Sequence, residues 1–300
     1  MKKITILMIT LIVLCSGCAQ KEKEEETMDD KQALYLVSKV DEYRYSSQDN
    51  SWKKTRETSY EYEKAYPVSM IRKETDSSTE IKTEFSYTFE NDVPVSMVRK
   101  DLNSNSETTV EYNDGRVYRS EFWGSEKNDH KVKLYQYANE DEYFTLVFHS
   151  SFNYIPEEQG GSDCGEEADE VLIVKNEKGL LEKTVNHGIY SNWIAGEDRI
   201  WYRFNGTYTM EYDEDGIAHS PSAVFRAGPP NRETVYEVTK ENGLVKEVVE
   251  KYKSDDGNWV ETGKLEFTYS DIEIDPIRYS LMINSHVVGE GNTYYIYNWY

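Results

Sequence analysis

Two stretches of nearly the same sequence decide the fold: YEYEKAYPVSMIRK at residues 60–73 and YTFENDVPVSMVRK at residues 87–100. The second copy follows the first at an offset of 27 residues, as from Pro67 to Pro94. In residues 81–89, apolar or aromatic side chains alternate with polar ones, the pattern of a strand that is buried on one face. A period of about 25 residues accommodates two strands and two turns. The repeated unit is therefore predicted to be a β-hairpin.

Looser copies of the unit continue along the chain, as at Val110-Glu111-Tyr112 and Tyr135-Gln136-Tyr137. Short polar sequences that mostly end in glycine separate the strand-like runs. Asp-Gly and Asn-Gly provide the positive φ angles that tight hairpin turns require. We therefore predict turns at 113–115, near 139–141, and at 177–179, 213–216, 241–243 and 255–257.

The segment Tyr208-Thr209-Met210-Glu211-Tyr212-Asp213-Glu214-Asp215-Gly216 resembles the core of the tyrosine-aspartate (YD) or RHS-type repeats of bacterial surface and toxin proteins. The resemblance extends over about residues 55–270 and implies a structural analogy, a long series of similar hairpins. It implies no toxin activity.

The composition agrees with an all-β domain, because 25 tyrosines are present and no segment after residue 31 has a helical apolar period. Counting turns gives about sixteen strands. We expect a long antiparallel meander of β-hairpin repeats, forming a curled sheet or half-barrel, with a β-sandwich as the alternative. Residues 155–170 are expected to form the longest loop and a seam between two halves, and residues 292–300 a covered final strand.

The first residues carry an export signal. Lys2 and Lys3 precede an apolar run from Ile4 to Leu14, which is too short to cross a bilayer. The following Ser16-Gly17-Cys18 resembles the lipobox of bacterial lipoproteins, although Cys15 stands where that family usually has leucine. The resemblance implies that residues 1–17 are a signal peptide, that cleavage falls between Gly17 and Cys18, and that Cys18 carries the lipid.

Residues 18–32 are rich in charge and have no apolar period, so we expect a disordered leash between the lipid and a β domain at residues 33–300. The full chain has a net charge of −22, and removal of Lys2 and Lys3 with the signal peptide makes it −24. This negative charge disfavours nucleic acid as a partner. The expected location is the extracytoplasmic side of the cell membrane.

The remaining motifs give little support to catalysis. Cys164 would be the one cysteine left in the β domain, and its acidic neighbours disfavour a reactive thiolate. The five histidines show no metal-ligand spacing, and no Gly-x-Ser-x-Gly or phosphate-binding loop is present. We expect no catalytic residue, no metal and no cofactor.

The six tryptophans are spread along the chain, and Trp123, Trp201 and Trp259 are candidates for an aromatic binding surface. The favoured hypothesis is a membrane-anchored, non-catalytic binding or structural lipoprotein whose partner is a glycan or an envelope protein. The alternatives are a carbohydrate-active hydrolase, which would need paired acids in a cleft, and a chaperone-like or immunity lipoprotein.

Overall fold

The computed structural model describes residues 33–125, 129–139, 142–151, 164–193, 200–225 and 233–288. The predicted signal peptide, lipidated Cys18, charged leash and strand at 292–300 lie outside these residues.

Sixteen strands form one antiparallel sheet, as the turn count predicted, and a single helix follows the last strand. The strands are β1 (Leu34–Ser46), β2 (Ser51–Glu63), β3 (Tyr66–Glu74), β4 (Glu80–Glu90), β5 (Val93–Asp101), β6 (Ser106–Asn113), β7 (Arg116–Trp123), β8 (Asp129–Tyr137), β9 (Glu142–Ser151), β10 (Cys164–Lys175), β11 (Leu181–Trp193), β12 (Ile200–Tyr212), β13 (Ala218–Phe225), β14 (Thr234–Glu241), β15 (Leu244–Lys253) and β16 (Trp259–Ile274). The helix, α1, spans Pro276–Val288.

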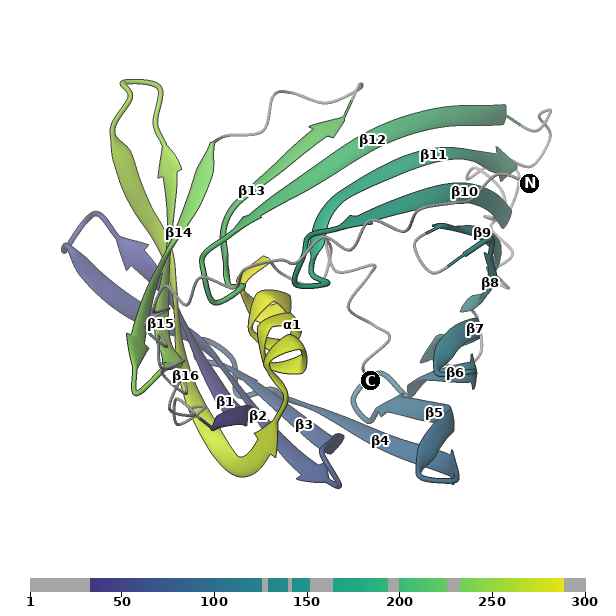
Figure 1. The fold of residues 1–300 in the computed structure, drawn as a ribbon, viewed down its shortest axis with the longest axis horizontal. Helices are drawn as coiled ribbons and strands as arrows, with labels where there is room; N and C mark the ends of the chain where they lie inside the picture. Colours follow the sequence, from purple (N-terminus) through teal and green to yellow (C-terminus); the bar gives the residue numbers. More distant parts are fainter. Residues whose placement is uncertain are drawn as a thin grey trace, which may run out of the picture. The chain divides into compact units, whose positions relative to one another are not determined.

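The sheet is a meander that curls, with α1 on its concave side (Figure 1). Strands β1 to β13 pair in chain order, and β1 also pairs with β16, which continues through β15 to β14. The two edge strands are thus β13 and β14, which follow one another in the chain. The prediction of a curled sheet of hairpins is confirmed, and the alternative of a β-sandwich is not what forms.

The two rims of the sheet differ. At the tight-turn rim, where even-numbered strands end, four hairpins turn through two residues that both have positive φ: Lys64-Ala65, Asn91-Asp92, Asp114-Gly115 and Asn242-Gly243. Such turns match the right-handed twist of paired strands. The opposite rim, the long-connection rim, carries longer connections such as residues 47–50 and 75–79.

Tyrosine hydroxyls tie neighbouring strands together at the tight-turn rim. Tyr62 donates to the carbonyl of Val37 at 2.7 Å, Tyr137 to that of Val117 at 2.9 Å, and Tyr269 to that of Val245 at 2.6 Å; Tyr212 donates to Leu181 in the same way. In each case the end of an even-numbered strand is bonded to the beginning of the preceding odd-numbered strand. Burial raises the pKa of Tyr137, Tyr212 and Tyr269, so these hydroxyls remain protonated donors.

Helix α1 corrects the expectation that no helix follows residue 31. Asp275 caps its first turn by accepting the Arg278 amide at 3.0 Å, and Pro276 occupies the first helical position, where proline is favoured. The helix buries Tyr279, Met282 and Ile283 with their neighbour Val287, a spacing of three, four and eight residues. These side chains pack against Val37, Val40, Val248, Phe267 and Met210 to form the main core.

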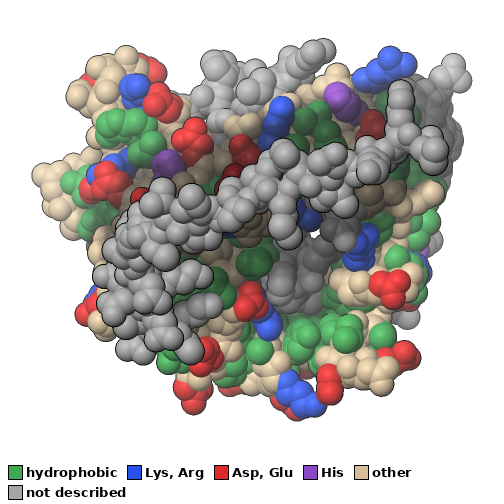
Figure 2. Space-filling model, in the orientation of Figure 1, with side chains coloured by type: hydrophobic (Ala, Val, Ile, Leu, Met, Phe, Trp, Pro, Cys, Tyr) green, Lys and Arg blue, Asp and Glu red, His purple; other side chains and the backbone are tan. Residues whose placement is uncertain are grey.

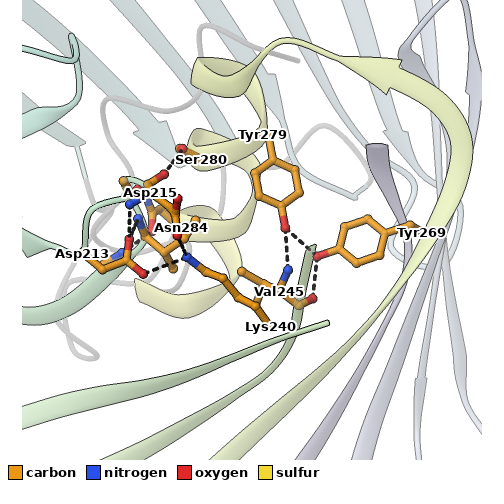
Figure 3. A network of polar contacts seen from close by, with 11 residues as sticks. Asp213, Asp215, Lys240, Val245, Tyr269, Tyr279, Ser280 and Asn284 are labelled. Carbon is orange, nitrogen blue, oxygen red and sulfur yellow. Dashed lines mark hydrogen bonds and ion pairs between the residues drawn. The ribbon is translucent and has the colours of Figure 1, made fainter. Parts of the chain in front are cut away.

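Polar side chains of α1 hold the two ends of the curled sheet together (Figure 3). The Asn284 amide accepts from the Ala218 amide at 2.8 Å and donates to the Gly216 carbonyl at 3.0 Å. The Tyr279 hydroxyl accepts from the Val245 amide at 2.7 Å. The helix therefore bonds both to the turn before edge strand β13 and to β15, the neighbour of edge strand β14.

A salt bridge joins the same elements directly, since Lys240 of β14 contacts Asp213 at 3.1 Å and also Asp215, both in the β12–β13 turn. Gly216 in this turn has φ +81°, and a Cβ there would lie 2.6 Å from Leu180 Cδ1. The glycine thus provides both the turn and the close packing of the turn against its neighbours.

The prediction of a loop at residues 155–170 is wrong for residues 164–170. Residues 164–170 belong to β10 and pair along their length with both β9 and β11. Cys164 is accordingly the first residue of a strand and not a loop residue. Residues 155–163 lie outside the described part of the chain.

Replacement of Asn284 by alanine is expected to lower the free energy of unfolding by roughly 2–4 kcal/mol, because it leaves a buried amide and a buried carbonyl without partners. Urea unfolding followed by circular dichroism measures the change. Ser285→Ala is the matched control, because among the described residues the Ser285 hydroxyl bonds to the Met282 carbonyl of its own helix and to no other element. Equal effects of the two substitutions would contradict the bridging role of Asn284.

Candidate functional site

The outer face of the sheet, opposite α1, is charged over much of its extent. Arg119 contacts Glu111 at 3.0 Å and also Glu121, which accepts from His130 across the next strand. Lys54 similarly joins Asp41 at 2.9 Å and Glu57 at 2.6 Å. Acidic and basic side chains are interspersed around the described surface in Figure 2. Such ladders keep a sheet face solvated and contribute little each to stability.

The same face becomes apolar over β8 to β11. Seven large apolar side chains there are 37–46% exposed: Leu134, Phe144, Leu146, Phe148, Leu172, Val174 and Ile189. Together they present roughly 600 Å² of apolar surface, as large as the largest patches on soluble monomers. We refer to these seven residues as the outer apolar patch. A patch of this size on an otherwise charged face indicates a contact surface.

Strand register makes the patch continuous. Leu134 pairs with Leu146, Leu146 with Ala168, and Ala168 with Ile189, so these four residues form one row across four strands. Directly paired residues share a face of the sheet and lie within side-chain contact distance. The row ends on β12 at Arg203, the partner of Ile189.

A groove of about 410 Å³ crosses this row. Ala168 and Gly188 lie along it and bring little side-chain bulk, while Phe144 and Leu146 line it from β9 and Ile189 from β11. The groove's volume and its mostly apolar lining with a few polar groups are typical of ligand and peptide sites. It is the candidate functional site.

A second row of paired residues lies beside the first and consists of Phe144, Glu170, His187 and Asn205. The last three are polar, and they line one part of the groove. His187 Nδ1 and Asn205 Oδ1 are 2.7 Å apart, which fixes the orientation of the imidazole. Arg203 is exposed and has no ion-pair partner among the described residues. The groove therefore combines apolar walls with one accessible cation and one carboxylate, Glu170, which can orient a bound segment.

The tryptophans that the sequence suggested lie elsewhere. Trp123 ends β7, while Trp201 and Trp259 lie at the starts of β12 and β16, so all three are at the long-connection rim. Strands β8 to β11 separate Trp123 from Trp201, and β1 to β6 separate Trp123 from Trp259. Trp123 stacks on His130 with ring centroids 3.8 Å apart, and Trp259 is 43% exposed beneath the Lys253 ammonium group. Gly17 and Cys18 lie outside the described residues.

Sequence reasoning did not find the groove, although a signal was present. Residues 143–148, YFTLVF, carry apolar side chains in both phases of the strand, and residues 171–174, VLIV, do the same. Apolar residues in both phases predict a strand covered on both faces. Here one phase is buried, with Tyr143, Val147 and Val171, and the other remains exposed.

The described residues contain no group of three or more His, Cys, Asp or Glu side chains that could hold a metal ion. Each described carboxyl group with a shifted pKa has it lowered by basic or hydrogen-bonding neighbours, as Glu121 does beside His130 and Arg119. No helix in the described residues has the length and apolar character needed to cross a bilayer.

The outer apolar patch is expected to bind the fluorescent dye 8-anilinonaphthalene-1-sulfonate. Replacing Leu146 by asparagine should reduce the fluorescence while changing the free energy of unfolding by only about 0.5 kcal/mol, because the side chain is exposed. Leu102→Asn is the matched control, since Leu102 is 44% exposed but lies in the connection between β5 and β6, outside the outer apolar patch. Unchanged fluorescence in Leu146→Asn would show that the dye does not use this surface.

Comparisons with known proteins give a likeness of fold only. No protein-family model matches the chain, and no curated protein matches it in sequence. Among solved structures, a porin-like protein from Bacteroides uniformis ATCC 8492 is similar, with 12% identity, a TM-score of 0.41, and coverage of 79% of this chain and 99% of that one. A porin-like protein from Bacteroides vulgatus ATCC 8482 gives 9% identity, a TM-score of 0.46, and coverage of 79% and 100%. At these identities and TM-scores the likeness concerns the fold and says nothing about what this chain binds.

Proposed function

We propose that this chain is a lipid-anchored, extracytoplasmic binding protein that holds another envelope protein in the groove of its outer apolar patch. The observation that carries the proposal is the exposed apolar row across β8 to β11, on a face that is elsewhere covered by ion pairs. A chaperone-like or immunity role would use the same surface.

The bound segment is expected to be apolar, with a polar or acidic group at one end. Apolar side chains would fill the groove between Leu146 and Ile189, and a carboxylate would pair with Arg203. The chain has an overall charge of −22, so an acidic group on the partner is repelled by most of the surface and attracted at Arg203. This contrast favours one orientation of the bound segment.

The proposed anchor is supported by the Ser16-Gly17-Cys18 sequence. Strand β1 starts at Leu34 on the tight-turn rim, so the leash would join the sheet at that rim. Fifteen residues between Cys18 and Leu34 reach at most about 50 Å when extended. The domain could therefore stand clear of the membrane while staying close to its surface.

Replacement of Cys18 by serine is expected to move the protein from the membrane fraction to the soluble fraction, because the thiol that would carry the diacylglycerol is lost. Fractionation of the producing cell with immunoblotting measures this, and Cys15→Ser is the control that should remain in the membrane fraction. Membrane retention of the Cys18 variant would contradict the anchor.

A photo-reactive phenylalanine analogue at Leu146 or Ile189 is expected to form one discrete protein adduct in living cells, whereas the same analogue at Leu102 should form none. The captured protein, once purified, should bind the unmodified chain and should lose at least about tenfold in affinity for Leu146→Asn.

Two results would contradict the docking proposal. One is labelling of lipid and not of protein from the groove positions. The other is equal binding of the purified partner to the unmodified chain and to Leu146→Asn.

A further inference from the structure

A second cavity, of about 380 Å³, lies on the concave side of the sheet. It is bounded by the last residues of α1, His286, Val287 and Val288, and by β1, β2, β14, β15 and β16. It shares no residue with the outer groove, and the binding of a protein partner proposed above makes no use of it.

One row of paired residues crosses this cavity. Arg44 of β1 pairs with Gly263 of β16, Gly263 pairs with Glu250 of β15, and Glu250 pairs with Tyr236 of β14. Because Gly263 has no side chain, the Glu250 carboxylate can lie over it, on the side of the row that leads to Arg44. A Cβ at Gly263 would lie 3.0 Å from Glu250 Oε2, so any larger residue would intrude on the carboxylate.

The two charges in this row do not neutralise each other. Arg44 is exposed and forms no ion pair with any described residue, while the Glu250 carboxylate accepts only the Thr262 hydroxyl at 3.0 Å among the described side chains. The neighbouring Glu42, which also lines the cavity, is bound by Arg56 at 3.2 Å. An unpaired cation and an unpaired anion thus line one cavity on either side of a glycine.

The end of α1 adds to this polarity. The C-terminal end of a helix carries partial negative charge, which favours a ligand with a cationic group in this cavity. His286 stays neutral at pH 7, because burial lowers its pKa to about 4, and its ring lies edge-on to those of Tyr60 and Phe267. Val287, Val288 and Leu265 provide an apolar portion of the lining.

We propose that this cavity binds a small zwitterion, an α-amino acid or a dipeptide, with its carboxylate paired to Arg44 and its ammonium group to Glu250. The ligand's side chain lies against the valines at the end of α1. Charge-assisted hydrogen bonds at both ends, separated by an apolar surface, select molecules that carry both charges. The volume lies at the small end of the range of ligand pockets, which suits a ligand of this size.

The experiment uses the mature chain with Cys18→Ser and isothermal titration with a panel of the common amino acids and alanyl dipeptides. At least one zwitterion should bind. Its N-acetyl and C-terminal amide derivatives should each bind at least about tenfold more weakly, because each lacks one charge.

Two variants assign the charges to their residues. Arg44→Gln should bind the zwitterion and its C-terminal amide equally, while it still binds the N-acetyl derivative more weakly. Glu250→Gln should bind the zwitterion and its N-acetyl derivative equally, while it still binds the amide more weakly. Lys246→Gln and Glu237→Gln are matched controls, because these exposed charges do not line the cavity and pair with Glu241 and Lys251. Both controls should bind like the unmodified chain.

The proposal is overturned if no member of the panel binds, or if blocking either terminus leaves the affinity unchanged. It is also overturned if both variants keep both discriminations. Because the outer groove is unaltered in these variants, cross-linking at Leu146 should be the same in all of them, so the two proposals succeed or fail separately.

Discussion

A sheet that does not close on itself has two edges whose backbone groups need partners or cover, and this constraint governs the whole molecule. Sixteen strands place those edges on β13 and β14, which are adjacent in the chain but do not pair in the described residues. Helix α1 bonds to the turn that precedes one edge strand and to the immediate neighbour of the other, through Asn284 and Tyr279. An exposed edge is a template for aggregation. The curl and the core on its concave side therefore depend on a helix formed after all sixteen strands.

The two faces of the sheet differ in how they are covered. The concave face buries the core beneath α1 and leaves a cavity where the helix ends. The outer face carries cross-strand ion pairs over β1 to β7, and its described side chains over β8 to β11 include seven large, exposed apolar groups. Apolar side chains at this density gain nothing from exposure, and this is the observation on which the proposed docking of a partner protein rests.

Local chemistry in the sequence predicted much of the fold. Alternation and the Asn-Gly and Asp-Gly pairs gave the strands, their number and most turns, because both are set by neighbouring residues. Helix α1 was missed because residues 276–288 have few charges to mark a solvent face, and its apolar side chains act only once the sheet exists. Tyrosines were interpreted as strand formers, yet Tyr62, Tyr137 and Tyr269 also donate to carbonyls 20–25 residues away. The groove depends on register across four strands, which no local pattern contains.

The clasp formed by α1 also limits how the chain can evolve. Repeats such as residues 60–73 and 87–100 suggest growth by duplication, and each added hairpin would begin and end at the same rim without disturbing its neighbours. Copy number would then be free to drift, as it is in open arrays. Here a single helix has to bond at both ends of the sheet, so the gain or loss of one hairpin would carry Ala218 out of reach of Asn284. The contacts of the helix therefore fit a sheet of this number of strands, and a sheet with one hairpin more or fewer would lose one of them.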